Sequence, residues 1–107
     1  MVRQGFERES DVMYAVKSLL SAVGFDCYSL SQGRTTRQSA GLPDLIGLHP
    51  TKGVLFVECK RPDGKRSAAQ SLFAARCIRA GVGYVCCSRL ETMQAYLTQQ
   101  GIIAMQL

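Results

Sequence analysis

The sequence predicts an α/β fold in which a mixed sheet is flanked by helices, and three observations lead to it. Apolar residues recur every three or four positions over residues 12–23, which is typical of an amphipathic helix. Strand-like segments at residues 41–47 and 54–60 lie on either side of a short turn, which is typical of a β-hairpin. Helical and strand-like segments then alternate, so the predicted order is α-β-β-β-α-β-α.

The first half of this order follows from the residues at the boundaries. The first helix is expected to end at Gly24, and a strand to follow over residues 25–30. Residues 31–41 are rich in Gly, Ser, Thr and Arg, a composition that predicts a loop. After the hairpin, a second helix is expected over residues 67–80, closed by Gly81.

The second half is assigned in the same way. Residues 84–88 are apolar and predict a short buried strand. A third helix is expected to begin after Ser88, with Glu91 completing a capping box, and to close on Gly101. Residues 102–107 are expected to form an edge strand.

Composition indicates one folded domain over residues 1–107 with an anionic partner. The chain has 107 residues, of which 47% are hydrophobic and 20% charged, and a net charge of +5. The span from 34 to 66 is the most basic part of the chain, and it contains Arg34, Arg37, Lys52, Lys60, Arg61, Lys65 and Arg66. A polyanion such as a nucleic acid is the expected partner, and a merely solvated basic surface is the alternative.

Cysteine usage and hydropathy predict where the protein works. The five cysteines form no C-x-x-C pair and there is one histidine, so buried free thiols in a reducing cytosol are expected rather than a zinc site. The first residues show no apolar signal region, and no stretch reaches membrane-spanning length. A cytoplasmic protein of a bacterium or of a phage-infected host cell, without membrane contact, is therefore expected.

The hairpin brings two acids together. A turn centred near Thr51 places Asp44 opposite Glu58, and facing Cβ atoms on antiparallel strands are roughly 4.5–5.5 Å apart. Two carboxylates at that distance repel unless a proton or a cation lies between them. Residues two apart on a strand share a face, so Lys60 projects beside Glu58 while Cys59 points the other way. Two oxygen ligands beside an ammonium group suit the hydrolysis of a phosphodiester.

Two further polar residues are candidates for the same site. Glu9 falls at the centre of the first helix's apolar stripe, where a carboxylate is costly unless it is paired or binds a metal. This reading requires the helix to start before Ser10, which could otherwise cap it. Gln70 lies near the inner face of the second helix, but with Ser67 it also matches a capping box, and the cap is the alternative role.

Taken together, these residues resemble the VRR-NUC family of the PD-(D/E)xK nuclease superfamily. A Pro-Asp or an E-x-K alone is a weak signal, whereas their order, the hairpin spacing and the basic turn that follows are fairly specific. The resemblance spans nearly the whole chain and rests on Glu9, Gly41-x-Pro43-Asp44, Glu58-x-Lys60 and Gln70. Cys59 is a less usual residue between the glutamate and the lysine than an aliphatic one.

The resemblance implies a restriction-endonuclease-like fold, an αβββαβ core whose central mixed sheet is flanked by helices. Asp44, Glu58 and the backbone carbonyl of Cys59 would bind Mg²⁺ or Mn²⁺, and Glu9 would complete the site directly or through water. Lys60 would be catalytic. The catalytic set implied in this way is Glu9, Asp44, Glu58, Lys60 and Gln70, the last orienting the lysine or water.

The resemblance also implies an activity and a partner. Small stand-alone relatives, often phage-encoded, resemble Holliday-junction resolvases and act as homodimers. A metal-dependent endodeoxyribonuclease that cuts branched DNA such as a four-way junction, and that acts as a homodimer, is therefore expected. The sequence does not define the pairing surface, for which the outer edge of the first helix and the carboxy-terminal strand are two candidates. The phosphate contacts are expected to be Arg34, Arg37, Arg61, Lys65 and Arg66.

Two alternatives stay open at this point. In the first, the chain is a nucleic-acid-binding module without catalysis, and the acids only pair with neighbouring basic residues. In the second, it is a nuclease of the same fold that acts on duplex ends, flaps or RNA. Incubation of nucleic-acid substrates with Mg²⁺, with Mn²⁺ and with EDTA separates binding from cleavage.

Overall fold

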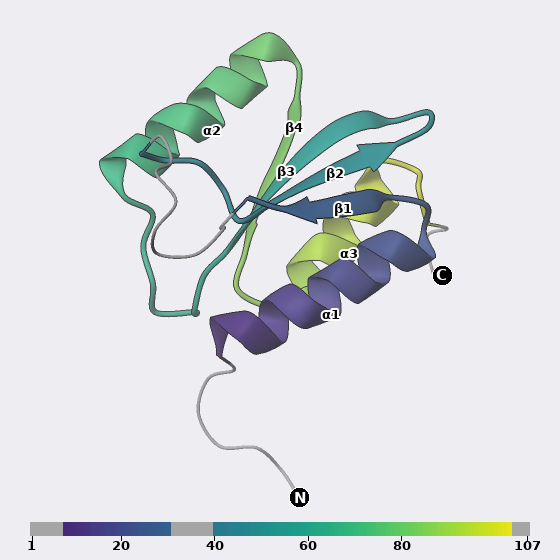
Figure 1. Ribbon diagram of the computed structural model, residues 1–107, viewed down its shortest axis with the longest axis horizontal. Helices are drawn as coiled ribbons and strands as arrows, with labels where there is room; N and C mark the ends of the chain where they lie inside the picture. The colour runs from purple at the N-terminus through teal and green to yellow at the C-terminus, as the bar shows by residue number, and fades with distance from the viewer. Residues whose placement is uncertain (1–7, 31–39, 104–107) are drawn as a thin grey trace, which may run out of the picture.

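The computed structural model describes residues 8–30 and 40–103 (Figure 1). Within these ranges the chain forms three helices and four strands in the predicted order. The elements are α1 (Glu9–Ala22), β1 (Asp26–Ser29), β2 (Leu45–His49), β3 (Gly53–Cys59), α2 (Ala68–Ala80), β4 (Gly83–Cys87) and α3 (Leu90–Gln99). The fold is thus a mixed sheet flanked by helices, as the sequence predicts.

The strands lie in the order β1-β2-β3-β4. β1 pairs with β2 and β2 with β3 in antiparallel fashion, whereas β4 is parallel to β3 because α2 carries the chain back across the sheet. The β2–β3 register runs from Leu45–Val57 to His49–Gly53. This confirms the predicted centre of the hairpin, on which the approach of Asp44 to Glu58 depends.

His49 fixes the turn of this hairpin. Its Nδ1 accepts hydrogen bonds from the backbone amides of Thr51 and Lys52, both at 3.2 Å. Because Nδ1 is an acceptor, Nε2 carries the proton, and it donates to the backbone carbonyl of Val23 at 3.3 Å. One imidazole therefore ties the hairpin to the end of α1.

One face of the sheet, called here the covered face, lies under α1 and α3 (Figure 1). Residues of alternating parity on β2, β3 and β4 point into it, as the pleat of a strand requires. The core there consists of Val12, Val16, Leu20, Phe25, Leu45, Leu55, Val57, Cys59, Val85, Cys87, Met93 and Leu97, all almost fully buried. This face supplies the apolar burial that stabilises the fold.

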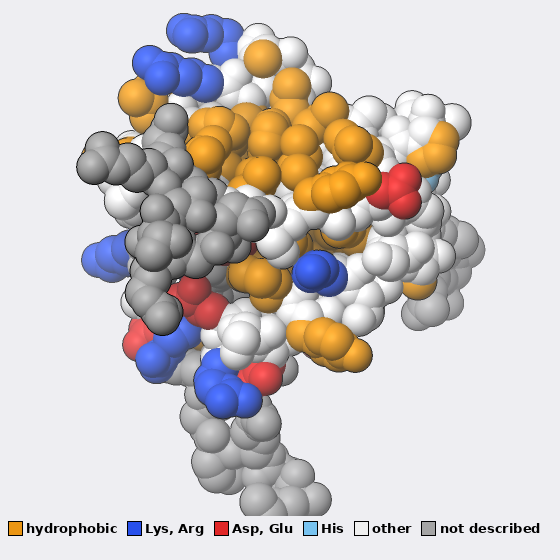
Figure 2. All heavy atoms as spheres, viewed as in Figure 1, with side chains coloured by type: hydrophobic (Ala, Val, Ile, Leu, Met, Phe, Trp, Pro, Cys, Tyr) orange, Lys and Arg blue, Asp and Glu red, His pale blue; other side chains and the backbone are white. Residues whose placement is uncertain are grey.

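The opposite face, called here the open face, is only partly covered. α2 packs on β4, and the Phe73 ring meets Phe56 edge-on at 5.1 Å between centroids. Away from α2, the side chains of Tyr28, Leu48 and Val54 stay 56%, 41% and 37% exposed. Figure 2 shows apolar side chains gathered beside α2 over the neighbouring part of the sheet.

Two details differ from the sequence prediction. α3 begins at Leu90 with Arg89 as its N-cap, and no side-chain hydrogen bond caps it, so the capping box predicted for Ser88 and Glu91 is wrong. The helix starts one residue later than predicted, which takes both side chains out of the capping positions. Ile102 and Ile103, the described part of the predicted edge strand, are not in a strand, and residues 104–107 lie outside the described residues. In the described part of the chain, no helix is long and apolar enough to cross a membrane.

Candidate active site

Asp44 lies between the loop and β2, and the backbone holds it firmly. Its amide donates to the carbonyl of Val57 at 3.0 Å, and its carbonyl accepts from the amide of Leu30 at 2.8 Å. Its carboxylate Oδ2 accepts a hydrogen bond from the amide of Cys59 at 2.8 Å. These bonds join β1, β2 and β3 around one acid, so the position of Asp44 is set by the sheet.

Glu58 projects from β3 on the open face, yet it is only 3% exposed. Its Oε2 accepts a hydrogen bond from Nε2 of Gln70 at 3.1 Å and lies 3.8 Å from Nζ of Lys60. Its other oxygen, Oε1, is buried and has no hydrogen-bond partner within the described residues. A buried carboxylate oxygen without a partner is costly and calls for an explanation.

Electrostatics add to this cost. Burial first, and then the negative charge of Asp44, raise the pKa of Glu58 from 4.5 to about 7, while Lys60 opposes the shift. A side-chain hydrogen bond with Asp44, which requires a proton on one of the two carboxyls, raises it further. Without a cation the carboxyl is therefore poised between its two protonation states near neutral pH. A strongly shifted acid next to a second acid is a feature of functional sites.

Cys59 and Lys60 follow Glu58 and alternate in direction. Cys59 is fully buried in the core of the covered face, whereas Lys60 returns to the side of Glu58 and its amide donates to the carbonyl of Cys87 at 2.9 Å. A hydrogen bond with the Cys87 thiol, together with burial, raises the pKa of the Cys59 thiol. Cys59 is thus a neutral core side chain, and its backbone is the part available to a site on the open face.

Gln70 forms the predicted cap and also contacts Glu58, while its role in catalysis stays a prediction. Its side-chain Oε1 accepts a hydrogen bond from the backbone amide of Ser67 at 2.8 Å, and its backbone amide donates to Oγ of Ser67 at 3.1 Å. This pair of bonds is the capping box of α2. Because Oε1 is used by the cap, Nε2 is directed to Glu58. The start of α2 and the acid on β3 are therefore tied through one amide.

Gly41 sets the distance between the loop that carries Asp44 and the start of α2. Its φ is +90°, and a Cβ at this position would lie 2.4 Å from the carbonyl oxygen of Ala69. Both the left-handed backbone and the close approach exclude a side chain here. Glycine at this position lets the loop rest directly on the first turn of α2, next to Gln70.

Glu9 is placed differently from the prediction. It is the first residue of α1 and is exposed, so it is not turned into the core. The helical-wheel argument assumed a core that extends to the start of the helix, whereas the first buried residue is Val12. The charge of Glu9 still contributes, as the smallest of the causes, to the raised pKa of Glu58. Its role in the site stays a prediction.

The predicted phosphate contacts are spread along the turn after β3 and beyond it. Arg61, Lys65 and Arg66 are exposed, and Nε of Arg61 pairs with Asp63 at 3.3 Å. Arg34 and Arg37 lie outside the described residues. Arg61 and Arg66 line one cavity together with Lys60 and therefore lie near the acids.

The acids fit a hard divalent cation. Mg²⁺ is usually held in proteins by one or two carboxylates while it keeps several waters. Asp44 and Glu58 supply such a pair, and the unpartnered Oε1 of Glu58 is an oxygen that a cation would satisfy. In the described ranges, no three or more His, Cys, Asp or Glu residues form a group that could hold a metal ion. Among the described side chains, a bound ion would therefore depend on Asp44 and Glu58, with water completing its coordination.

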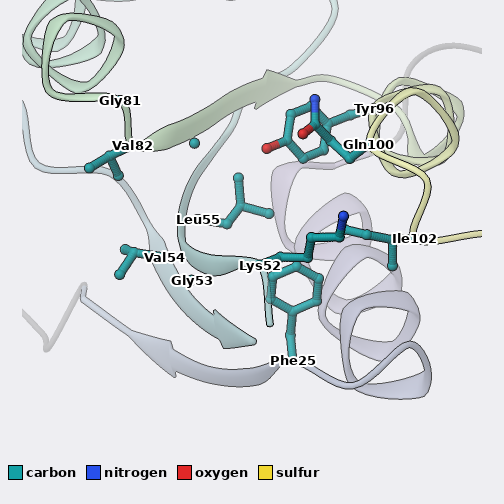
Figure 3. Close-up of a pocket in the computed structure, with 11 residues that line it drawn as sticks. Phe25, Lys52, Gly53, Val54, Leu55, Gly81, Val82, Tyr96, Gln100 and Ile102 are labelled. Atoms are coloured by element: carbon teal, nitrogen blue, oxygen red, sulfur yellow. The ribbon is translucent and has the colours of Figure 1, made fainter. Parts of the chain in front are cut away.

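A cavity of about 460 Å³ lies away from Asp44 and Glu58 (Figure 3). Its walls come from the starts of β3 and β4 and the end of α3, and include Leu55, Tyr96 and Gln100 (Figure 3). Glu58 is at the far end of β3. The described residues that line this cavity include no Asp, Glu or His, so the acids on the open face form the better candidate for catalysis.

Sequence reasoning missed the contribution of β4. In the parallel register Cys86 lies beside Glu58, and Cys87 beside Cys59, so the end of β4 borders the site. A signal was present, because a strand-helix-strand unit places the carboxyl ends of its two parallel strands at one edge of the sheet. This signal places Cys86 beside Glu58 only when β4 is known to be the neighbour of β3 in the sheet.

Comparison with known proteins identifies the family. The family model described as the VRR-NUC domain matches residues 15–89, a span that includes Asp44, Glu58, Lys60 and Gln70 and begins after Glu9. A solved structure described as a VRR_NUC domain is similar to this chain at 25% sequence identity, with a TM-score of 0.65, covering 85% of this chain and 94% of that one. No curated protein matches. From the fold and from the family match over most of its length, we conclude that the chain belongs to the VRR-NUC family of nuclease domains.

Proposed function

We propose that the protein is a metal-dependent endodeoxyribonuclease that hydrolyses phosphodiester bonds in branched DNA, such as a four-way junction. The surroundings of Glu58 support the proposal. Glu58 is buried with an unpartnered oxygen, the neighbouring charge of Asp44 raises its pKa, and Lys60 stands 3.8 Å from its other oxygen. A purely structural buried acid would have hydrogen-bond partners for both of its oxygens, as buried charges usually do.

The residues around Glu58 have distinct tasks in this proposal. Asp44 and Glu58, with the Cys59 carbonyl, would hold Mg²⁺ or Mn²⁺. When bound, such an ion supplies Lewis-acid chemistry for the attacking water, the phosphoryl oxygen and the departing 3′ oxygen. The ammonium of Lys60 would hold a water or offset negative charge on the phosphoryl group. Gln70 would keep Glu58 in place through its hydrogen bond.

The test compares substrates and metals. Radiolabelled four-way junction, flap, duplex and single-stranded DNA, and an RNA strand, are incubated with Mg²⁺, with Mn²⁺ and with EDTA. Cleavage that needs the metal and favours the junction is expected, and Glu58→Gln should abolish it. Glu91→Gln removes one exposed acid on α3 and serves as the matched control, which should cleave normally.

Other outcomes identify the alternatives. Binding without cleavage in either metal contradicts the nuclease proposal and favours a binding module. Cleavage that prefers flaps, duplex ends or RNA keeps the chemistry but contradicts the junction specificity.

A homodimer is part of the proposal, because symmetric resolution of a junction requires two sites related by a two-fold axis. The open face supports it. Leu48 and Val54 are directly paired across β2 and β3. Tyr28 on β1 is exposed on the same face, where it pairs with Ile46, and Asp26 lies beside Leu48. Apolar side chains that are contiguous and exposed in this way mark interaction surfaces.

The dimer is tested by mass in solution, using light scattering after gel filtration. Leu48→Lys should shift the mass toward that of a monomer. Tyr14→Lys, which alters an exposed aromatic residue on the outside of α1, should leave the dimer unchanged. A dimer that is lost with Tyr14→Lys and kept with Leu48→Lys would move the interface to α1.

A further inference from the structure

A smaller cavity of about 190 Å³ lies on the β4 side of the acids and is called here the basic pocket. Its described walls are Lys60, Arg61, Pro62, Gly64, Arg66 and Cys86–Ser88. Cys86 is the β4 residue directly beside Glu58, whereas Asp44 approaches Glu58 from β2. Glu58 is thus flanked by a second acid on one side and by the basic pocket on the other.

The charge of the pocket is of one sign. Lys60, Arg61 and Arg66 line it, and no acid is among its described lining residues. Asp63 pairs with Arg61 outside the pocket lining, and Arg66 has no acidic partner in the described part of the chain. The guanidinium of Arg66 lies over the Tyr84 ring, 5.9 Å from its centroid, which favours a fixed orientation. Lys60 and Arg61 each lie near one acid outside the lining, and three cations that converge on one cavity in this way still form a site for an anion.

The size of the pocket limits what this anion is. Pockets that enclose whole small-molecule ligands usually have roughly 300–1,000 Å³, whereas the basic pocket has about 190 Å³. It therefore suits one charged group of a larger molecule. Two arginines and a hydroxyl from Ser88 are donors well suited to phosphate oxygens.

We propose that the basic pocket binds a single phosphate group of the nucleic acid, next to the phosphate that is hydrolysed. Lys60 shows that the pocket adjoins the acids, because it lines the pocket and also lies 3.8 Å from Oε2 of Glu58. A strand that places one phosphate at the acids places a neighbouring one in the pocket. This inference rests on the proposed function and adds Ser88 and the end of β4 to the substrate surface.

The experiment measures binding in EDTA, so that it does not depend on cleavage. DNA in which one phosphate at a time is replaced by a neutral methylphosphonate is titrated against the full chain and against Arg66→Gln. The matched control is Arg79→Gln, which removes one exposed arginine from the last turn of α2, outside the pocket lining. Arg66→Gln should weaken binding about tenfold and reduce the slope of log affinity against log salt by about one, because one phosphate contact is lost. Arg79→Gln should change neither.

The decisive result is coupling at one position. A methylphosphonate at that position should lower the affinity of the unmodified protein for DNA, but should lower the affinity of the Arg66→Gln protein only slightly. This position should adjoin the cleaved bond. Comparison of 5′-phosphate and 5′-hydroxyl ends then tells whether the pocket takes an internal or a terminal phosphate. Equal effects of Arg66→Gln and Arg79→Gln, or equal methylphosphonate costs in both proteins at every position, would overturn the proposal. Coupling without cleavage in Mg²⁺ or Mn²⁺ would instead overturn the proposed nuclease and leave a phosphate-binding pocket.

Discussion

On β3, Leu55 and Val57 are buried beneath α1 and α3, whereas their neighbours Val54 and Glu58 point to the side that carries α2. The covered face has a continuous apolar core, while the open face has an exposed apolar surface at one end and a buried acid at the other. The same few strands serve both faces because their side chains alternate. Stability and chemistry can therefore be changed separately by mutating adjacent residues.

The largest effect is expected from the chemistry of the open face. Lys60→Ala should lower the rate of cleavage by about a hundredfold or more, since it removes the ammonium beside Glu58. Affinity for DNA should fall far less, because other cations keep contact with phosphates. Single-turnover cleavage and fluorescence anisotropy measure the two quantities. A Lys60→Ala protein that cleaves at the normal rate would show that its role is wrongly assigned.

A pair of neighbouring substitutions sharpens the contrast in stability. Leu55→Ala should lower the free energy of unfolding by about 2–5 kcal/mol, because it leaves a cavity in the core of the covered face. Val54→Ala, one residue earlier on the open face, should cost about 1 kcal/mol or less. Chemical denaturation measures both. Both variants are made in the Leu48→Lys background, because the proposed dimer would bury Val54. Similar losses in the monomer would contradict the contrast between the two faces.

The pH dependence of stability isolates the cost of Glu58. Its pKa is raised from 4.5 to about 7 in the folded state, so the folded protein holds its proton more tightly than the unfolded chain does. In EDTA, the contribution of the protonated Glu58 to the free energy of unfolding is fully present below pH 4.5. It is lost as the pH rises toward 7, by up to about 3 kcal/mol. Denaturation at pH 5 and at pH 8 should show the difference, and Glu58→Gln should remove most of it. A pH-independent difference between the two proteins would contradict the shifted pKa.

The smallest effect separates the two roles of Gln70. Gln70→Glu should keep the capping box of α2, since glutamate accepts the same bond from Ser67, but it removes the donor to Glu58. Cleavage should fall about tenfold with its pH profile displaced upward, because a second charge disfavours ionisation of Glu58. The free energy of unfolding at pH 5, where Glu58 is protonated, should change little. Gln70→Ala loses the cap as well and should cost about 1 kcal/mol of stability. Equal stability of the two variants would mean that the cap contributes nothing.

Local patterns predicted the elements and the hairpin register well. The turn around Thr51 led to the correct pairing of β2 with β3, and the Ser67–Gln70 pair led to the cap of α2. Both depend on residues close in sequence, where spacing alone determines which groups meet. The cap of Gln70 does not exclude a contact with the acids, because the oxygen of its side-chain amide serves the cap while the nitrogen donates to Glu58.

Features that depend on tertiary context were predicted less well. Glu9 lies on the apolar side of α1 in a helical wheel, but the core begins only at Val12, so Glu9 is exposed. The position of β4 beside β3 could not be derived from hydropathy, and with it the basic pocket was missed. Burial at a helix end and the neighbour order of strands are decided by the packing of the whole chain.

The contact of Gly41 with Ala69 has a consequence for the dimensions of the site. A single methyl group at position 41 would act as a wedge between the segment that leads to Asp44 and the turn that holds Gln70. Every charge of the site would be retained, and only the spacing would differ. A substitution at position 41 would thus show how strongly the activity depends on the distance between Asp44 and the start of α2.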